Sequence, residues 1–116
     1  MNMTVRYLGC SLLLVATSVF AHHGWNEYDA TRPLQLEGSI EQSGYTHPHG
    51  MLRLKTTDKI WNVVLAPPSR MENRGLSKDM LAVGNTVTVV GYPNRNTADE
   101  MRAERITVND KTVELR

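Results

Sequence analysis

The sequence has little cysteine, few aromatic residues and no long apolar run. Its 116 residues include one cysteine, one phenylalanine and two tryptophans. It contains no Gly-x-Ser-x-Gly elbow and no phosphate-binding glycine loop, so hydrolase or transferase chemistry has no visible carrier. We also find no internal repeat, low-complexity tract or coiled-coil pattern.

The sequence also lacks an excess of charge of either sign. The sequence contains 13 lysines and arginines and 12 aspartates and glutamates, and residues of the two charges are interspersed along the chain. Nonspecific nucleic-acid binding and charge-driven membrane binding both require a concentrated positive field. We therefore expect neither a nucleic acid nor a membrane surface as partner.

Residues 1–21 have the features of an export signal. A short front segment carries Arg6, an apolar run follows from Leu12 to Ala16, and Val19-Phe20-Ala21 fits the small-x-small cleavage pattern. The apolar run is shorter than the ~20 residues that a spanning helix needs. Cys10 precedes the apolar run, which argues against a lipoprotein. We predict cleavage after Ala21 and a periplasmic or secreted protein.

Cleavage at this point leaves a small mature protein without cysteine. Removing 21 of 116 residues leaves 95, which is room for one domain. The mature chain can form no disulfide and no thiolate site, and we expect no transmembrane segment in it. We divide the chain into a signal peptide (1–21), a histidine-led segment (22–33) and a barrel domain (34–116).

The body of the chain alternates apolar and polar residues with the period of β-strands. The first strand shows this most clearly from Leu34 to Glu41. Further strands are expected at residues 52–55, 60–65, 86–90, 101–108 and 112–115. Thr57-Asp58-Lys59 predicts a hairpin turn between the second and third strands, and Asn109-Asp110 predicts a second one before the last strand.

One short helix interrupts the strands. Pro67-Pro68 ends the third strand, Ser69-Arg70-Met71-Glu72 has the spacing of a capping box, and Gly75 is placed to end the helix. A further short turn is expected at residues 77–81. Met71 and Met80 are expected as core residues.

Three strands, a short helix and then two or three strands is the order of an OB-like barrel. We therefore predict an all-β fold with one short helix, a small five- to six-stranded OB-like barrel. A simple barrel of other topology and an open β-sandwich are the alternatives.

The mature chain resembles a family of small exported bacterial proteins known as a domain of unknown function, with a layout similar to periplasmic OB-fold proteins. The motifs that carry the resemblance are His22-His23-Gly24, Leu36-Glu37-Gly38, Pro48-His49, Arg74-Gly75-Leu76 and Gly91-Tyr92-Pro93. Members of this family resemble the chain in a histidine pair after the signal peptide and in Asn-Pro-His after the first strand. Here His47 stands where asparagine is usual, so the resemblance implicates His22, His23 and His49 and leaves His47 as a departure. It implies fold and location, and no activity.

All four histidines lie in two tight pairs, His22-His23 and His47-Pro48-His49. After cleavage, His22 would offer a metal both its α-amine and a ring nitrogen, and a ring nitrogen of His49 would make a third ligand. Copper(II) favours such planar nitrogen sets. The arrangement is a histidine brace, and it requires the amino terminus to fold back on the loop after the first strand, which Pro48 would stiffen. Zinc is the weaker alternative, since no cysteine and no assignable second-shell carboxylate accompany the histidines.

Other residues have simpler explanations. Trp25 and Tyr28 either stack on a ligand or pin the tail to the barrel, and Trp61 is expected to pack against the core or the hairpin. Glu37 and Glu41 are expected on one polar strand face, and they are most simply solvated. A mixed-charge surface network is expected from Arg95, Arg102, Glu104 and Arg105.

Two functions from different classes follow from the sequence. In the first, the protein is an exported copper-binding module using His22 and His49, with His23 or His47 as further ligands. In the second, it is an OB-like envelope module that contacts a protein or small ligand, and its histidines are ordinary tail and loop residues. Oxidative catalysis at the histidine pair ranks last, because so small a domain shows no substrate platform, and we expect a non-enzymatic protein.

Overall fold

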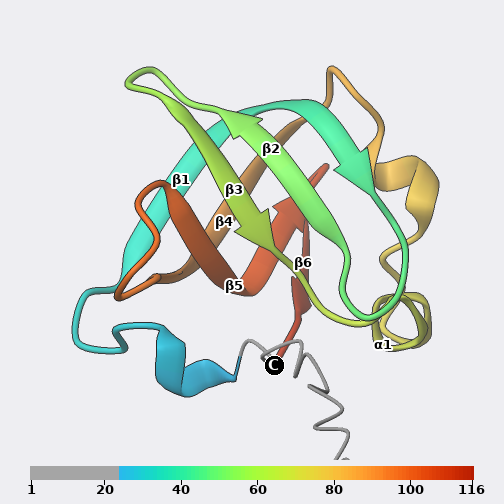
Figure 1. The fold of residues 1–116 in the computed structure, drawn as a ribbon. Coiled ribbons are helices and arrows are strands. Elements are labelled where there is room, and N and C mark those ends of the chain that lie inside the picture. The colour runs from blue at the N-terminus through green and yellow to red at the C-terminus, as the bar shows by residue number, and fades with distance from the viewer. Residues whose placement is uncertain (1–23) are drawn as a thin grey trace, which may run out of the picture.

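The computed structural model describes residues 24–116, which form a curled sheet with short helical turns at its margin (Figure 1). The elements in chain order are η1 (Trp25–Glu27), β1 (Leu34–Gly44), β2 (Met51–Lys55), β3 (Ile60–Val64), α1 (Pro68–Asn73), η2 (Lys78–Leu81), β4 (Thr86–Pro93), β5 (Glu100–Val108) and β6 (Lys111–Glu114). The predicted strands are all present. The 3-10 turn η1 was not predicted.

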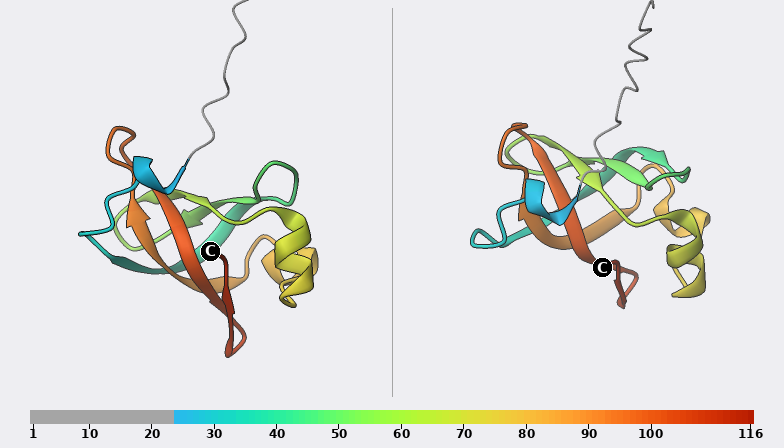
Figure 2. Two further views of the ribbon diagram at one scale, coloured as in Figure 1. Left: turned by 90° about the horizontal axis from the view of Figure 1, so that it is seen from below. Right: turned by 60° about the horizontal axis from the view of Figure 1, so that its bottom comes forward.

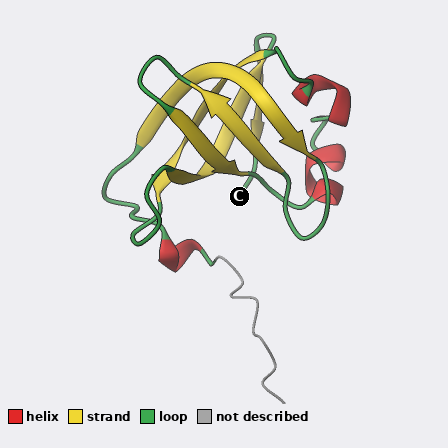
Figure 3. Ribbon diagram, turned by 45° about the horizontal axis from the view of Figure 1, so that its top comes forward, coloured by secondary structure: helices red, strands yellow, loops and turns green. Residues whose placement is uncertain are grey.

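The sheet closes on itself into a five-stranded barrel. Its strand order is β3-β2-β1-β4-β5-β6, and β3 also pairs with β5 in parallel, which joins the two ends of the sheet. All other pairings are antiparallel. Figure 3 shows the strands curving around one interior. β6 pairs with β5 outside the ring that the β3–β5 pairing closes. This is the OB-like barrel predicted from the sequence, with one extra strand.

The barrel interior is filled by side chains that alternate along the strands. Leu52 and Leu54 of β2, Val63 of β3, Val87 and Val89 of β4, and Met101, Ala103 and Ile106 of β5 are all buried. The alternating burial of β2 is that of a strand with one face inside and one outside. The predicted core residue Met71 is fully buried, whereas Met80 is half-buried against the core.

The helix α1 begins earlier than predicted. Its N-cap is Pro67, with Pro68 in the first turn and no side-chain capping hydrogen bond, so the capping box expected at Ser69 is wrong. Proline suits a first helical turn because it has no amide hydrogen to satisfy there. The predicted end at Gly75 is confirmed: Gly75 has φ +84°, and the amides of Leu76 and Gly75 donate to the carbonyls of Met71 and Glu72. These are the two bonds of a Schellman cap.

Two strands are longer than predicted. β1 continues to Gly44 through a bulge between Ile40 and Gln42, which bends it from β4 toward β2. The bulge also breaks the alternation on which a shared face for Glu37 and Glu41 was based, although both residues are exposed. β4 includes Tyr92 and Pro93, which had been expected in a loop. The Asn109-Asp110 turn is confirmed, with φ of 49° and 64°.

The connections of the barrel fall into two groups. The β2–β3 turn and the β4–β5 loop lie at one end, where Lys59 pairs with Asp99, and Tyr28 of the N-terminal segment contacts Asn94 and Glu100 at this end. The β1–β2 loop and α1 lie toward the other end, and the left view of Figure 2 shows η1 and α1 on opposite sides of the barrel.

Candidate functional site

The histidines fall on both sides of the limit of the described structure. His22 and His23 lie outside the described residues. His47 and His49 lie in the β1–β2 loop, residues 45–50, where His47 is exposed and His49 is half-buried. The His47-Pro48 peptide bond is cis. Within residues 24–116, no three histidine, cysteine, aspartate or glutamate side chains are grouped so that they could hold a metal ion.

The β1–β2 loop is anchored at both ends. At its start, the Tyr45 hydroxyl donates to the Leu76 carbonyl at 2.6 Å, and burial raises the pKa of this phenol. At its end, the Gly50 amide donates to the Ala66 carbonyl at 2.9 Å and the Leu65 amide donates to the Gly50 carbonyl at 2.8 Å. His49 therefore directly precedes a fixed point of the backbone.

Gly50 lies close to the helix α1. A Cβ added to it would lie 2.6 Å from the Cε atom of Met71, which belongs to α1. A larger residue here would therefore require the end of the buried Met71 side chain to shift.

The N-terminal segment, residues 24–33, is attached to the barrel by backbone hydrogen bonds. The Asp29 amide donates to the Pro93 carbonyl at 2.9 Å and the Arg95 amide to the Glu27 carbonyl at 2.8 Å. Tyr28 forms an isolated antiparallel bridge with Asn94. The start of the described chain is therefore held against the end of β4.

Buried Tyr28 adds a side-chain attachment. Its hydroxyl donates to Glu100 Oε2 at 2.9 Å, and Asn94 Nδ2 donates to the same oxygen at 2.8 Å. Burial, followed by the Glu100 carboxylate, raises the pKa of Tyr28 far above its usual value, so the phenol stays protonated and able to donate. Of the two roles considered for Tyr28, pinning the tail is the one observed.

Trp25 is packed between two arginines. The Arg102 guanidinium carbon lies 4.3 Å from the indole centroid and that of Arg116 lies 4.6 Å away. The Tyr92 ring meets the indole edge-on at a centroid distance of 6.2 Å. Both cations contribute favourable cation–π contacts, so Trp25 also pins the tail.

Arg102 is the buried charged residue of this region, with 8% of its surface exposed. Burial lowers its pKa, and the nearby Arg70 and Arg116 lower it further. The predicted surface network is partly correct: Arg105 contacts Glu114 at 2.9 Å and Glu104 at 3.8 Å. The expectation of a surface position fails for Arg102, because the N-terminal segment covers it.

The strand register places the covered arginine in one row with the start of β2. Met51 pairs with Val64 of β3, and Val64 pairs with Arg102 of β5. Residues in register on neighbouring strands project from the same face of a sheet, and the next residues, Leu52, Val63 and Met101, point into the core. Met51 therefore lies on the outer face beside the region that Trp25 covers, and it is two residues from His49.

A small hollow lies beside Met51. It measures about 290 Å³ and is lined by the end of β1 and the facing parts of β2 and β3, namely Gln42, Ser43, Gly44, Met51, Leu52, Arg53 and Asn62. Met51 is 38% exposed there. Nothing in the sequence identified Met51 as a candidate residue, although the sequence shows that it follows His49 by two positions.

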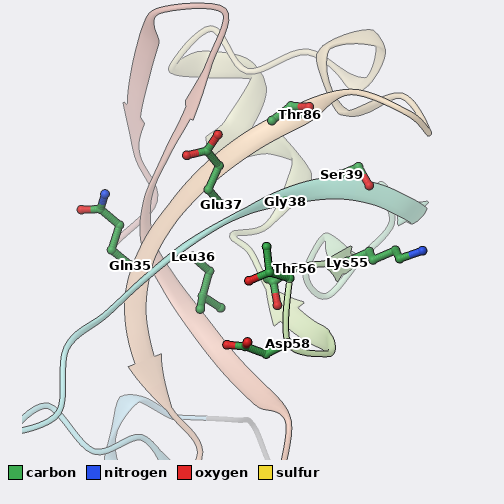
Figure 4. A pocket seen from close by; sticks show the side chains of 10 residues that line it. Gln35, Leu36, Glu37, Gly38, Ser39, Lys55, Thr56, Asp58 and Thr86 are labelled. Atoms are coloured by element: carbon green, nitrogen blue, oxygen red, sulfur yellow. The ribbon is translucent and has the colours of Figure 1, made fainter.

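A larger groove lies between β1 and the β2–β3 turn, and neither His47 nor His49 lines it. It measures about 750 Å³ and is lined by residues 35–39, 55–58 and Thr86. Figure 4 shows Leu36 projecting between β1 and the turn that carries Thr56 and Asp58, with Glu37 on the opposite side of the strand. Lys55 pairs with Ser39 as the last residue of β2, so the β1 edge from Gln35 to Glu37 runs past the end of its neighbour.

The second tryptophan, Trp61, lies in β3 beside the β2–β3 turn. Trp61 is half-buried against the core, and the Lys59 ammonium lies 4.2 Å from its ring centroid. Lys59 also pairs with Asp99 at 2.6 Å. This confirms the expectation that Trp61 packs at the hairpin.

The sequence also shows which protein family the chain belongs to. Residues 11–102 match a family described as a family of unknown function (DUF6152). The chain belongs to this family. Its membership confirms the resemblance to a family of unknown function, and no curated protein matches the chain in sequence.

Solved structures support the fold. A chain of the S. pombe Stn1–Ten1 complex matches with a TM-score of 0.55 and 18% identity, over 69% of this chain and 60% of that one. TiaS in complex with a transfer RNA and ATP matches with a TM-score of 0.52 and 20% identity, over 77% of this chain and 20% of that one. The ZRD-deleted mutant of TiaS with agmatine matches with a TM-score of 0.51 and 18% identity, over 76% and 25%.

These matches show the barrel fold alone. The DUF6152 chain spans 60% or less of the length of each of the three matching chains. Separately, a search of residues 24–116 finds no helix long and apolar enough to cross a membrane.

Proposed function

We propose that this protein is an exported copper-binding module that holds the ion through the α-amine and ring of His22 and the ring of His49. The observation that supports the proposal is the row from Met51 through Val64 to Arg102, because Trp25 stacks on Arg102 and Met51 directly follows the loop that carries His49.

The distances along this row favour a meeting of the two histidines. Neighbouring strands lie about 4.8 Å apart, so the backbones of Met51 and Arg102 are about 10 Å apart. Trp25 stacks on Arg102. Two residues of extended chain ahead of Gly24 span about 7 Å, and the His49 side chain adds its own length from the other side.

The rigidity of both parts supports the same proposal. A three-ligand site needs ligands whose positions are fixed by the fold. The N-terminal segment is held by Tyr28 and Trp25, and the β1–β2 loop is held at Tyr45 and Gly50. Residues 24–33 and the β1–β2 loop are therefore both attached to the barrel.

The donor set favours copper over zinc. Two ring nitrogens and an amine fit the planar nitrogen coordination of copper(II), which binds nitrogen sites more tightly than zinc does. A structural zinc site needs four ligands. The sequence after residue 21 contains no cysteine that could supply the fourth.

The test is copper(II) titration of the protein with an authentic His22 terminus. We expect tight binding that is lost in His49→Ala and in a form with one alanine ahead of His22. His47→Ala is the matched control, since it removes a histidine from the same loop and leaves the three ligands. Weak binding that is identical in all four proteins would overturn the proposal.

Export requires a separate test. Mass spectrometry of the protein secreted from a bacterial host is expected to show a chain beginning at His22. Cleavage at any other bond would remove the α-amine from the site and contradict the proposal, whatever the titration shows.

The groove beside β1 favours a second candidate, an envelope module that binds an extended segment of another protein. The Ile40 amide donates to the Asn85 carbonyl, on the β4 side of β1. Gly38 and Leu36 lie two and four residues before Ile40, so their amides also point to the β4 side. The amides of Gln35 and Glu37 therefore point to the groove. An extended peptide can add to such an edge as a new strand. Fast hydrogen exchange at Gln35 and Glu37, against slow exchange at Leu36 and Gly38, would support an available edge, and equal protection would exclude it.

A further inference from the structure

We infer that the open edge of β1 selects a basic extended segment of a partner protein, in which a lysine or arginine faces Glu37 and the neighbouring apolar side chain covers Leu36. The inference rests on the second candidate function, the binding of an extended segment, and names the chemistry of that segment. It is independent of the copper proposal, because neither His47 nor His49 lines the groove.

The strand register defines how much of the β1 edge is free. β1 pairs with β4 from Leu34 onward, whereas its pairing with β2 begins only at Ser39, opposite Lys55. An added Cβ at Gly38 would collide with the Lys55 backbone carbonyl, so the end of β2 fills the space beside Gly38. The free edge is therefore residues 34–37. A segment that runs antiparallel to β1, in line with β2, can pair with this edge.

Leu36 gives the free edge an apolar side. It is half-buried and packs only partly against the core, and Figure 4 shows it projecting between β1 and the β2–β3 turn. Paired residues on neighbouring strands project from the same face of a sheet. A segment residue paired with Leu36 therefore lies beside it on the barrel side, and an apolar side chain there would remove the exposed part of Leu36 from water.

The groove carries more negative than positive charge. Glu37 on β1 and Asp58 on the turn are both exposed lining residues, and neither forms an ion pair with another residue of the described chain. Lys59, which follows Asp58, pairs with Asp99 instead. Lys55 is the one cation among the lining residues, and in Figure 4 its ammonium points away from both carboxylates.

This charge sets the preferred residue opposite Glu37. Directly opposite residues on antiparallel strands have Cβ atoms about 5 Å apart, where opposite charges attract and like charges repel. The segment residue paired with Glu37 projects outward, as Glu37 does. Lysine or arginine is therefore favoured at this position, and aspartate or glutamate is disfavoured.

The test uses two acetylated and amidated peptides, Lys-Val-Thr-Val and Glu-Val-Thr-Val. Antiparallel pairing places the first residue opposite Glu37, the first valine opposite Leu36 and threonine opposite Gln35. Each peptide is titrated into isotope-labelled protein and followed by NMR. We expect both to shift the amide signals of Gln35 and Glu37, and the lysine peptide to bind about fivefold more tightly.

Two sets of variants separate charge from backbone pairing. The double variant Glu37→Gln/Asp58→Asn is expected to remove the preference for the lysine peptide. Glu41→Gln/Asp79→Asn is the matched control: it removes the same charge from exposed residues outside the groove, so the preference is expected to stay.

Gln35→Pro removes an amide that faces the groove, and proline is tolerated where a strand amide faces solvent. It is expected to weaken both peptides about fivefold through the lost hydrogen bond, with the fold checked by thermal unfolding.

The outcomes distinguish this inference from the function on which it rests. If both peptides bind equally and Gln35→Pro weakens both, the edge binds extended segments and the selection for a basic residue is wrong. A preference that survives in Glu37→Gln/Asp58→Asn also overturns the selection. If neither peptide binds, or if Gln35→Pro binds both as the parent does, pairing at the β1 edge itself is wrong and both proposals fail.

Discussion

The outer face of β5 is covered by another segment of the chain, whereas the outer edge of β1 is open. Over β5, residues 24–28 lie against the barrel and reduce the exposure of Arg102 to 8%. Along β1, the segment from Gln35 to Glu37 borders an open groove of about 750 Å³. The covered face is built from both ends of the described chain, whereas the open edge is left by the end of a neighbouring strand. The comparison shows that the N-terminal segment is a part of the fold.

The largest effect is expected from separating β4 from β5, the strand that the N-terminal segment covers. An added Cβ at Gly91 would collide with the Arg102 backbone carbonyl, so Gly91→Ala must separate β4 from β5. We expect a loss of about 3 kcal/mol in the free energy of unfolding, measured by urea denaturation.

Gly84→Ala is the control for this glycine. Gly84 has φ +93° but open space around its Cα, so alanine there costs only backbone strain of about 1 kcal/mol. Equal losses for the two variants would show that the close approach of β4 to β5 is not what Gly91 provides.

The two tryptophans sharpen the comparison, because Trp25 packs against cations within the covered face and Trp61 packs against a cation outside it. Trp25→Ala removes the contacts with Arg102, Arg116 and Tyr92, and Trp61→Ala removes the contact with Lys59. We expect each to lose about 2 kcal/mol of stability. Copper affinity is expected to fall at least tenfold in Trp25→Ala alone, and a similar fall in Trp61→Ala would separate copper binding from the covered face.

A smaller effect is expected from loosening the segment at Tyr28. Tyr28→Phe removes the hydrogen bond to Glu100, at a cost of about 1.5 kcal/mol because the acceptor is charged. The pKa of Tyr28 is raised in the folded protein. Its contribution is therefore present below pH about 10 and lost as the pH rises further. Unfolding measured along an alkaline pH series checks both, and a parent and variant of equal stability below pH about 10 would contradict the role of the bond.

The smallest effect concerns the turn that joins the covered segment to the open edge. Asp29 accepts hydrogen bonds from the amide and hydroxyl of Thr31, which lower the pKa of its carboxyl group. This contribution is present above the ordinary aspartate value of about 3.9 and is lost as the pH falls through the lowered pKa. An NMR titration of the Asp29 carboxyl carbon is expected to give a midpoint below that value, and a midpoint at or above it would be evidence against the turn bonds.

The sequence predicted the barrel because local signals and topology agreed. Alternation located the strands, Gly75 ended the helix, and Asn109-Asp110 made the last hairpin, each through backbone conformations that those residues favour. The start of α1 was missed because a proline in the first helical turn competes with Ser69 as a starting signal.

The site was harder to predict because its parts meet only in three dimensions. Nothing in the sequence around Trp25 shows that Arg102 and Arg116 will enclose it, since 77 and 91 positions separate them along the printed sequence. Met51 was missed for a similar reason: its outward direction depends on the strand register with Val64. The sequence shows both histidine pairs, but it does not show where the fold places His47 and His49.

The attachment of the N-terminal segment also sets an order of events. Residues 24–28 are synthesised first, yet their partners Pro93, Asn94, Glu100 and Arg102 belong to β4, β5 and the loop between them. Contacts so distant in sequence form late, after the strands that carry them have paired. A site of the kind proposed, built on this segment, would therefore form only with the finished barrel.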